Sequence, residues 1–276
     1  MKVEDETRFE QEVEELMEQV HQQYGYDFRG YSRASLYRRI RRFTGNAGIG
    51  SMEQLQRSVL ENSYFFEGFL QEITVNVTEM FRDPSFFLSL RQNVLPLLST
   101  YPFIKIWDAG CSTGEELFSL AVLLQEEGLL DRTKIYATDV NQKVLRQAKE
   151  GIFPASNISA YTAGYYASGG KYNFSEYYVS NYGSLKFKSY LIKNVVFYPH
   201  NLATDASFNE FHLIVCRNVL IYFTHPLQER VFKLFDESMV ELGYLGLGKK
   251  ETLALSSISS KYQLTDKSNR IYRKAG

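Results

Sequence analysis

The chain has 276 residues, of which 44% are hydrophobic and 23% are charged, and its formal net charge is −1. This size and composition are typical of a globular protein with one large core and a smaller second domain. The balanced charge gives no reason to expect a nucleic acid as a partner. Two cysteines without framework spacing favour a reducing compartment, and the acid-rich N-terminus is unlike a signal peptide. The most apolar stretch, residues 211–223, is too short to span a bilayer. We expect a cytoplasmic protein without a membrane-inserted segment.

The first part of the chain has the residue spacing of helices. Apolar side chains recur at helical intervals over residues 9–20, 36–43 and 65–73. Ser51 begins a capping-box pattern that predicts one more helix between the last two of these stretches. We therefore predict an all-helical domain over residues 1–75.

The pattern changes to alternating strands and helices from residue 103 onward. Strands are predicted at residues 103–109, 134–138, 194–198 and 211–216, with helices at residues 117–125 and 141–149 and a further helix that begins near Pro226. Asp83 and Pro84 are a suitable N-cap and first-turn pair for a helix that precedes this region. Alternation of this kind predicts an α/β fold with a doubly wound, mainly parallel sheet, here over residues 76–276.

The alternation is interrupted between residues 161 and 190. This stretch is rich in Tyr, Gly and Ser, and its aromatic content is too high for a disordered linker. We interpret it as a small β insertion, a subdomain of about residues 155–192.

A strand followed by a small-residue turn is the most informative local feature. Residues 106–116 read Ile-Trp-Asp-Ala-Gly-Cys-Ser-Thr-Gly-Glu-Glu, and the next predicted strand ends at Asp139. A nucleotide-like cofactor needs close backbone approach after the first strand and an acid that grips a ribose after the second. Either feature alone would be compatible with an ordinary strand-to-helix turn, so the prediction depends on the pair.

The residues in the turn restrict the class of cofactor. A dinucleotide fingerprint would place glycines at the positions of Gly110, Ser112 and Glu115, and two of these three are missing. A glutamate near the helix start would repel a pyrophosphate, and no Walker lysine follows. S-adenosylmethionine fits better, because it carries a ribose, an ammonium and a sulfonium but no phosphate.

Four segments resemble the signatures of a known enzyme family. Residues 74–84, Thr-Val-Asn-Val-Thr-Glu-Met-Phe-Arg-Asp-Pro, resemble a segment of the chemotaxis receptor methyltransferases, the CheR-type protein-glutamate O-methyltransferases. Residues 109–116 resemble the cofactor turn of that family. Residues 200–202, His-Asn-Leu, and residues 216–223, Cys-Arg-Asn-Val-Leu-Ile-Tyr-Phe, resemble its two later signatures, and the last is the most specific. The four segments occur in family order, and with the helical N-terminal part the resemblance covers nearly the whole chain.

The chain departs from the family pattern at three places. Met80 stands where an aromatic residue is usual, residues 242–246 replace a common Pro-Gly-Gly-type turn, and Lys249-Lys250 precede Glu251 where a small residue is more usual. These departures leave the subtype within the family open.

The resemblance implies that S-adenosylmethionine is the cofactor. The residues it assigns to cofactor binding are Asn76, Thr78, Arg82, Glu115, Asp139, Asn201, Leu202, Arg217 and Asn218. Arg82 can clamp a carboxylate at the methionine end of the cofactor. Glu115, or Glu116 beside it, is a candidate for the ammonium, although either could simply complement the helix dipole. Asp139 should accept hydrogen bonds from both ribose hydroxyls.

The resemblance also implies the remaining roles. Asn201 and Leu202 would hold the adenine, and Arg217 follows a strand at its carboxyl end, where open α/β sheets bind ligands. Arg82 and Tyr222 are the predicted catalytic residues, and Tyr222 would orient the acceptor carboxylate. The chemistry requires no metal, and we expect none.

A stripe of arginines indicates a partner. Five arginines and no acid lie between Ser32 and Phe43. In the family such a helix docks on the acidic methylation helices of a chemoreceptor, and Arg38, Arg39 and Arg42 are the predicted docking residues. The alternatives are a solvated charged face or a partner for the acidic first helix, and an RNA-binding stripe is weaker because the net charge is −1.

The predicted function is transfer of a methyl group from S-adenosylmethionine to glutamates on the cytoplasmic helices of a chemoreceptor. A methyltransferase acting on another protein or on a small carboxylate stays open, as does a non-catalytic regulator that docks on receptors. The presence of Arg82, Asp139, Arg217, Asn218 and Tyr222 argues against lost catalysis. We expect a monomer.

Overall fold

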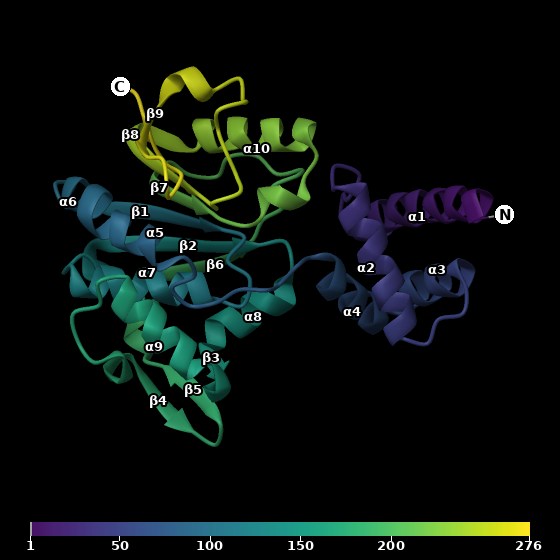
Figure 1. Cartoon of the computed structure of the whole chain (residues 1–276), viewed down its shortest axis with the longest axis horizontal. Coiled ribbons are helices and arrows are strands. Elements are labelled where there is room, and N and C mark those ends of the chain that lie inside the picture. The colour runs from purple at the N-terminus through teal and green to yellow at the C-terminus, as the bar shows by residue number, and fades with distance from the viewer. Residues whose placement is uncertain (1) are drawn as a thin grey trace. The chain divides into compact units, whose positions relative to one another are not determined.

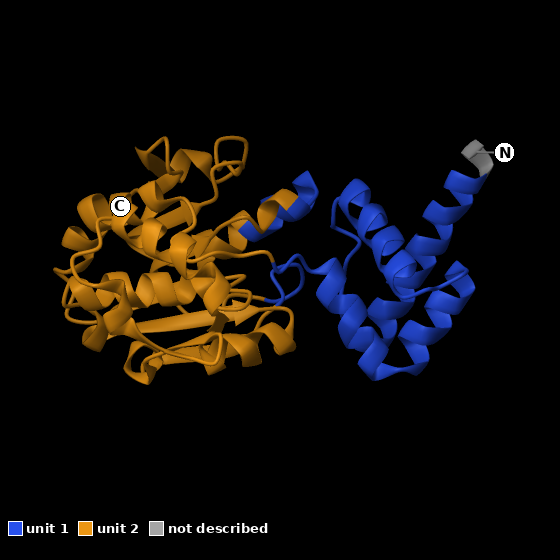
Figure 2. Cartoon of the chain, turned by 60° about the horizontal axis from the view of Figure 1, so that its bottom comes forward, with its two compact units in different colours: residues 1–76, 201–205, 222–231 blue, residues 77–200, 206–221, 232–276 orange. Residues whose placement is uncertain are grey.

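The computed structural model of this protein describes the backbone of residues 2–276 and the side chains of residues 5–276. It contains two compact units, which Figure 2 shows in blue and orange. The first, the helical unit, comprises residues 1–76, 201–205 and 222–231. The second, the sheet unit, comprises residues 77–200, 206–221 and 232–276.

The N-terminal part of the helical unit contains four helices, as the sequence predicts. These are α1 (Lys2–Tyr24), α2 (Arg33–Asn46), α3 (Met52–Glu61) and α4 (Ser63–Ile73) (Figure 1). Their apolar faces meet in one core, whose members include Leu16, Ile40 and Phe69, each fully buried. Ser51 caps α3 as predicted, because its side chain accepts a hydrogen bond from the Gln54 amide at 3.2 Å, whereas the Gln54 side chain accepts from the Gly50 amide at 3.0 Å.

The sheet unit is built on a seven-stranded sheet with the order β6-β2-β1-β7-β8-β10-β9. Its strands are β1 (Ile104–Ala109), β2 (Thr133–Asp139), β6 (Val195–Pro199), β7 (Phe211–Cys216), β8 (Met239–Leu247), β9 (Tyr262–Asp266) and β10 (Ile271–Lys274). The first five strands in the spatial order are parallel, and β10 and β9 are antiparallel to their neighbours. The predicted mainly parallel sheet is therefore confirmed.

The strand order reverses between β1 and β7, which is where doubly wound sheets bind ligands. The chain moves outward from β1 through β2 to β6, then returns to pair β7 with the other edge of β1. The helices of this unit are α5 (Pro84–Ser89), α6 (Leu95–Leu98), α7 (Glu115–Glu126), α8 (Gln142–Glu150), α9 (Ile158–Ala167) and, shared with the helical unit, α10 (His225–Glu237). A π-helical turn spans Leu90–Val94, and 3₁₀ turns span Leu130–Arg132, Ala155–Asn157, Phe174–Tyr177, Ser189–Ile192, Leu220–Tyr222 and Ser259–Lys261.

The predicted β insertion is present, but part of the segment is helical. A three-stranded sheet in the order β3-β5-β4 consists of β3 (Ile152–Pro154), β5 (Ser184–Phe187) and β4 (Tyr178–Asn181). Helix α9 lies between β3 and β4, where the aromatic content had suggested strands only. Tyr161 and Tyr165 are four residues apart, so they share one helix face, and both are almost fully buried. The burial of this face explains why the segment forms a helix.

Candidate functional site

Two turns lie against each other at the reversal point of the sheet. Gly110, directly after β1, has φ +84°, and a Cβ atom at this position would lie 2.6 Å from Cγ2 of Val219, in the turn after β7. Gly114, at the start of α7, has φ +100°, and its Cβ would lie 3.0 Å from that of Ala148 in α8. A side chain at either position would be strained and would push these elements apart. The glycines therefore allow a compact crevice at the carboxyl ends of β1 and β7.

Asp139 lies at the end of β2 and is bound to the turn after β1. Its Oδ2 accepts a hydrogen bond from the Ser112 amide at 3.0 Å, and its Oδ1 accepts one from the Asn141 amide at 2.9 Å. Burial raises the pKa of Asp139 to about 6, although the backbone hydrogen bonds oppose this shift. The amides fix the orientation of the carboxylate and leave further lone pairs for hydroxyl donors.

Glu115 and Glu116, between which the sequence does not decide, have different partners in the structure. Glu116 pairs with Arg217, its Oε2 lying 2.6 Å from Nη1 of the arginine. Glu115 is buried at the first position of α7, and its Oε2 accepts a hydrogen bond from Thr113 Oγ1 at 2.6 Å. Burial raises the pKa of Glu115. Glu115 is therefore the better candidate for a cationic ligand, since the charge of Glu116 is already compensated.

Arg217 joins three segments of the sheet unit. Besides Glu116, its Nη2 lies 2.9 Å from Oδ2 of Asp83 and donates to the carbonyl oxygen of Arg82 at 2.9 Å. The guanidinium lies over the ring of Phe86, 4.2 Å from its centroid. Asp83 and Pro84 stand at the N-cap and first position of α5, as predicted, but the Asp83 carboxylate makes no capping hydrogen bond and instead binds Arg217 and the ammonium of Lys249.

Asp108 is a buried acid at the end of β1 that the sequence analysis did not single out. Its side chain is fully buried, and neither carboxylate oxygen has a hydrogen-bond partner among the described residues. Burial, with the nearby charges of Glu116 and Asp139, raises its pKa well above the usual range. The sequence could have indicated Asp108, because it lies near the end of β1, just before the glycine turn, in the same way as Asp139 lies at the end of β2. A crevice lined by these acids suits a cationic ligand and disfavours a phosphate.

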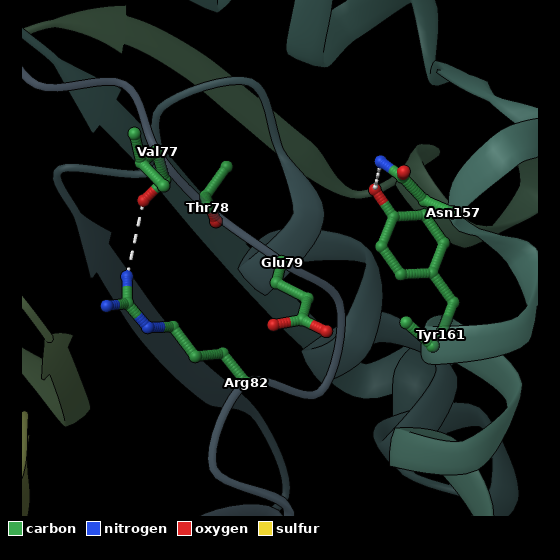
Figure 3. A pocket seen from close by; sticks show the side chains of 7 residues that line it. Val77, Thr78, Glu79, Arg82, Asn157 and Tyr161 are labelled. Carbon is green, nitrogen blue, oxygen red and sulfur yellow. Dashed lines mark hydrogen bonds between the residues drawn. The ribbon is translucent and has the colours of Figure 1, made fainter.

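The segment before α5 and the start of α9 line a cavity of about 310 Å³ (Figure 3). Its lining residues are Val77, Thr78, Glu79, Arg82, Asn157, Ala160 and Tyr161. Arg82 Nη1 donates to the Val77 carbonyl oxygen at 3.2 Å, and Asn157 Nδ2 donates to the Tyr161 hydroxyl at 3.3 Å. The pKa of Tyr161 is raised by burial and by the charge of Glu115, among others, so the cavity is electrostatically linked to the start of α7. Thr78 and Arg82 were predicted site residues, whereas Asn157 and Tyr161 were missed because the insertion was interpreted as strands.

Glu251 holds the turn that carries Asn218. Asn218 has φ +61°, an unusual conformation for a side chain other than glycine. The buried Glu251 carboxylate accepts hydrogen bonds from the amides of Asn218, Val219, Ile221 and Gly248 at 2.6–3.3 Å. Glu251 thereby fixes the conformation of the turn whose Val219 side chain lies against Gly110, and so stabilises the backbone of the site.

Four predicted cofactor or catalytic residues belong to the helical unit. Asn76 Nδ2 donates to the Gln71 carbonyl oxygen at 3.1 Å, and Asn201 Oδ1 accepts from the Ala203 amide at 3.0 Å. Leu202 is buried, and Tyr222 is partly buried.

The predicted docking arginines of α2 differ in their surroundings. Arg38 and Arg42 are exposed, and Arg42 forms an ion pair with Glu72, whereas Arg39 is partly buried. Arg33 and Arg41, on the same helix, pair with Glu14 at 2.7 Å and Glu6 at 2.6 Å of α1. The acidic first helix therefore compensates part of the positive stripe.

The fold and the crevice define the class of this protein. A parallel sheet that reverses beside a glycine turn, with acids rather than phosphate-binding groups, defines a Rossmann-like domain for a cationic nucleoside cofactor. Residues 76–270 match the family model described as "CheR methyltransferase, SAM binding domain", and residues 11–74 match "CheR methyltransferase, all-alpha domain". The chain belongs to the CheR methyltransferase family, and its cofactor is S-adenosylmethionine.

Named relatives agree with the family. The chain is 47% identical over 264 residues to a Pseudomonas putida protein named "Putative methyltransferase Cher3", with 96% of this chain and 97% of that protein covered. It is 31% identical over 225 residues to "Chemotaxis protein methyltransferase 1" of Vibrio cholerae, with 78% and 79% covered. It is 27% identical over 231 residues to "Chemotaxis protein methyltransferase" of Listeria monocytogenes, with 83% and 85% covered.

Among the described residues, no group of three or more His, Cys, Asp or Glu side chains could hold a metal ion. None of the helices in the described part of the chain is long and apolar enough to cross a bilayer.

We expect cofactor binding to weaken at acid pH through Asp139. Its raised pKa of about 6 means that its contribution to the stability of the cofactor-free protein is fully present below its usual pKa and is lost as the pH rises through about 6. Ribose hydroxyls require the ionised carboxylate, so the affinity for S-adenosylhomocysteine should fall about tenfold from pH 7 to pH 5. Calorimetry measures this, with Asp139→Asn as the control that binds weakly at both pH values. A wild-type affinity that does not change would contradict the assignment.

Replacement of Glu251 by alanine should destabilise the protein. The amides of Asn218, Val219, Ile221 and Gly248 would lose their buried acceptor, at a cost of about 3 kcal/mol in the free energy of unfolding. Urea denaturation measures the change, and Glu150→Ala, at an exposed position on α8, is the control. Equal stability of the two variants would show that the turn does not depend on Glu251.

Proposed function

We propose that this protein transfers the methyl group of S-adenosylmethionine to glutamate side chains on the cytoplasmic helices of chemoreceptors. It would act in the cytoplasm as a monomer. Residues 1–75 would dock on the receptor, and residues 76–276, with the β subdomain at about residues 155–192, would carry the reaction. The observation that supports this best is the cavity lined by Thr78, Arg82 and Tyr161, because the charge of Glu115 in the cofactor turn acts on the Tyr161 hydroxyl.

The acids of the crevice suit the charge of the cofactor. Asp139 would accept the ribose hydroxyls, and Glu115 would hold the ammonium. The buried carboxyl of Asp108 has no hydrogen-bond partner among the described residues, and burial of such a group is costly. Burial raises the pKa of all three carboxyls, and for Asp108 the charges of Glu116 and Asp139 add to this effect, so a bound cation would favour their ionised forms.

The remaining assigned residues would orient the cofactor. Asn76, Thr78 and Arg82 would line its methionine end, where the Arg82 guanidinium can bind a carboxylate with two hydrogen bonds. The adenine would lie against Asn201 and Leu202. Arg217 and Asn218 would contribute to the cofactor site by shaping the crevice, Arg217 through its ion pairs and Asn218 through the turn in which it lies.

The reaction requires accurate positioning of the acceptor and the methyl group rather than a general base. A glutamate acceptor is already ionised at neutral pH, so no proton has to be removed. When bound, S-adenosylmethionine supplies a methyl group on a sulfonium, which a carboxylate oxygen can attack in line. Tyr222 would orient the acceptor carboxylate and Arg82 would hold the methionine end of the cofactor, and such placement can contribute several orders of magnitude in rate. Exclusion of water favours the step, because the two reacting charges neutralise each other.

Arg82→Ala and Tyr222→Phe should each lower turnover without unfolding the chain. Loss of one orienting group is expected to reduce kcat at least about tenfold. The measurement is transfer of labelled methyl groups from S-adenosylmethionine to a purified chemoreceptor cytoplasmic fragment, with thermal unfolding as the control for folding. Wild-type turnover in both variants would contradict their assigned roles.

Charge reversal at Arg38 should weaken receptor docking. Arg38 is exposed on α2, so Arg38→Glu should raise KM for the receptor fragment about tenfold at low ionic strength, and the difference should shrink in added salt. Arg57→Glu on α3 is the matched control, because Arg57 is exposed but lies outside the stripe. An equal rise in KM for Arg38→Glu and Arg57→Glu would show that the effect comes from the change in net charge and not from a docking surface on α2. Affinity for S-adenosylhomocysteine should be unchanged in both.

A further inference from the structure

The backbone at Tyr222 is bound to the loop before α2. Within the helical unit, the Ser32 amide donates to the Tyr222 carbonyl oxygen at 2.7 Å, and the Thr224 amide donates to the Gly30 carbonyl oxygen at 2.8 Å. Tyr31 and Phe223 form an antiparallel bridge between these hydrogen bonds. The three contacts fix the main chain on which the Tyr222 side chain stands.

Side chains reinforce this attachment. The rings of Tyr31 and Phe223 pack edge to face with centroids 4.9 Å apart. Gly30 lies so close to Leu227 that a Cβ atom would be 2.7 Å from its Cδ2. Residues 30–32 and 222–227 therefore pack as one local structure.

Arg39 contacts the ring of Tyr222. Its guanidinium carbon lies 5.2 Å from the ring centroid, within the range of a cation–π interaction. The guanidinium is held from behind, because Nε donates to Ser35 Oγ and Nη1 donates to the Glu72 carbonyl oxygen, both at 3.2 Å. Arg39 is thus directed at the ring by its own helix and by α4.

Arg39 also differs from the other arginines of α2. Arg33, Arg38, Arg41 and Arg42 are exposed, whereas Arg39 is partly buried, and burial lowers its pKa. A cation that has lost part of its hydration interacts more strongly with an aromatic face than an exposed one does. The position of Arg39 suits an internal contact better than an electrostatic contact with a partner.

We propose that Arg39 is a positioning residue for Tyr222 and not a docking residue for the receptor. The main-chain hydrogen bonds fix one end of the tyrosine, and the guanidinium fixes the face of its ring. A tyrosine side chain has only two torsions that direct its ring. Together these contacts therefore fix the direction in which the Tyr222 hydroxyl points. The inference rests on the proposed role of Tyr222 in orienting the acceptor.

Fluorine NMR tests the contact without any substrate. The full chain is labelled with 3-fluorotyrosine, and the Tyr222→Phe variant identifies the Tyr222 signal among those of the 20 tyrosines. Arg39→Ala should shift or broaden that signal, and Arg39→Lys should shift it less because a cation remains. Arg41→Ala is the matched control, since Arg41 lies over Phe9 and pairs with Glu6. A Tyr222 signal that is the same in Arg39→Ala and wild type would overturn the proposal.

Kinetics with the receptor fragment separate positioning from docking. Loss of a partly desolvated cation–π contact should lower kcat about fivefold to thirtyfold in Arg39→Ala, with KM for the fragment nearly unchanged. In a Tyr222→Phe background Arg39→Ala should cause no further loss, because both changes act through the same hydroxyl. A raised KM with unchanged kcat would instead assign Arg39 to docking.

The two proposals fail in different ways. If Tyr222→Phe lowers kcat and Arg39→Ala does not, the inference about Arg39 is wrong and the proposed function stands. If Tyr222→Phe has wild-type turnover, the catalytic role of Tyr222 is wrong, and with it the purpose assigned to Arg39.

Discussion

The site of this protein depends on a buried cation. Arg217 follows β7, and its guanidinium pairs with Glu116 at the start of α7 and with Asp83 before α5. Its side chain is only 1% exposed, so the charge could not remain without these partners. The ion pairs bring together the strand end, the helix start and the segment that carries Arg82. Because Arg217 pairs with Glu116, the Glu115 carboxylate binds Thr113 instead, and because Arg217 pairs with Asp83, that carboxylate does not cap its helix.

Besides Arg217, the site contains several buried acids. Asp108, Glu115 and Asp139 are buried close to the cofactor turn, and burial raises the pKa of each. Burial of carboxylates is unfavourable without a compensating charge nearby. We therefore expect the site to favour a sulfonium cofactor over phosphate-bearing nucleotides. The glycine turn and the Glu251 hydrogen bonds supply the rigid backbone that this selectivity needs.

Local patterns in the sequence predicted the fold well. The helical spacing before residue 75 and the strand–turn–helix around Gly110 were confirmed, because each depends on neighbouring residues and on burial of one face. Helix α9 was missed, since the aromatic content of the whole insertion was interpreted as strands and the buried stripe of this helix is short. The aromatic content of a segment says that it is buried, but only the spacing of Tyr161 and Tyr165 says in which conformation.

The site was harder to predict, for a physical reason. Asp139 could be proposed because strand ends bind ligands, but the division of roles between Glu115 and Glu116 depends on Arg217, about one hundred residues away. Glu251 and Tyr161 come from segments with no cofactor signature of their own. The pairing of Arg39 with Tyr222 joins residues that sequence analysis placed in separate domains. Long-range ion pairs and ring contacts of this kind leave no periodic pattern in a sequence.

The most direct test of the central claim is to locate the transferred methyl group. A purified chemoreceptor cytoplasmic fragment is incubated with this protein and S-adenosylmethionine, digested and examined by mass spectrometry. We expect methyl esters on glutamate side chains, which mild base removes, and none when Arg82→Ala replaces the wild-type protein. Methyl groups on another residue type, or an active enzyme that leaves every receptor glutamate unmodified, would contradict the account.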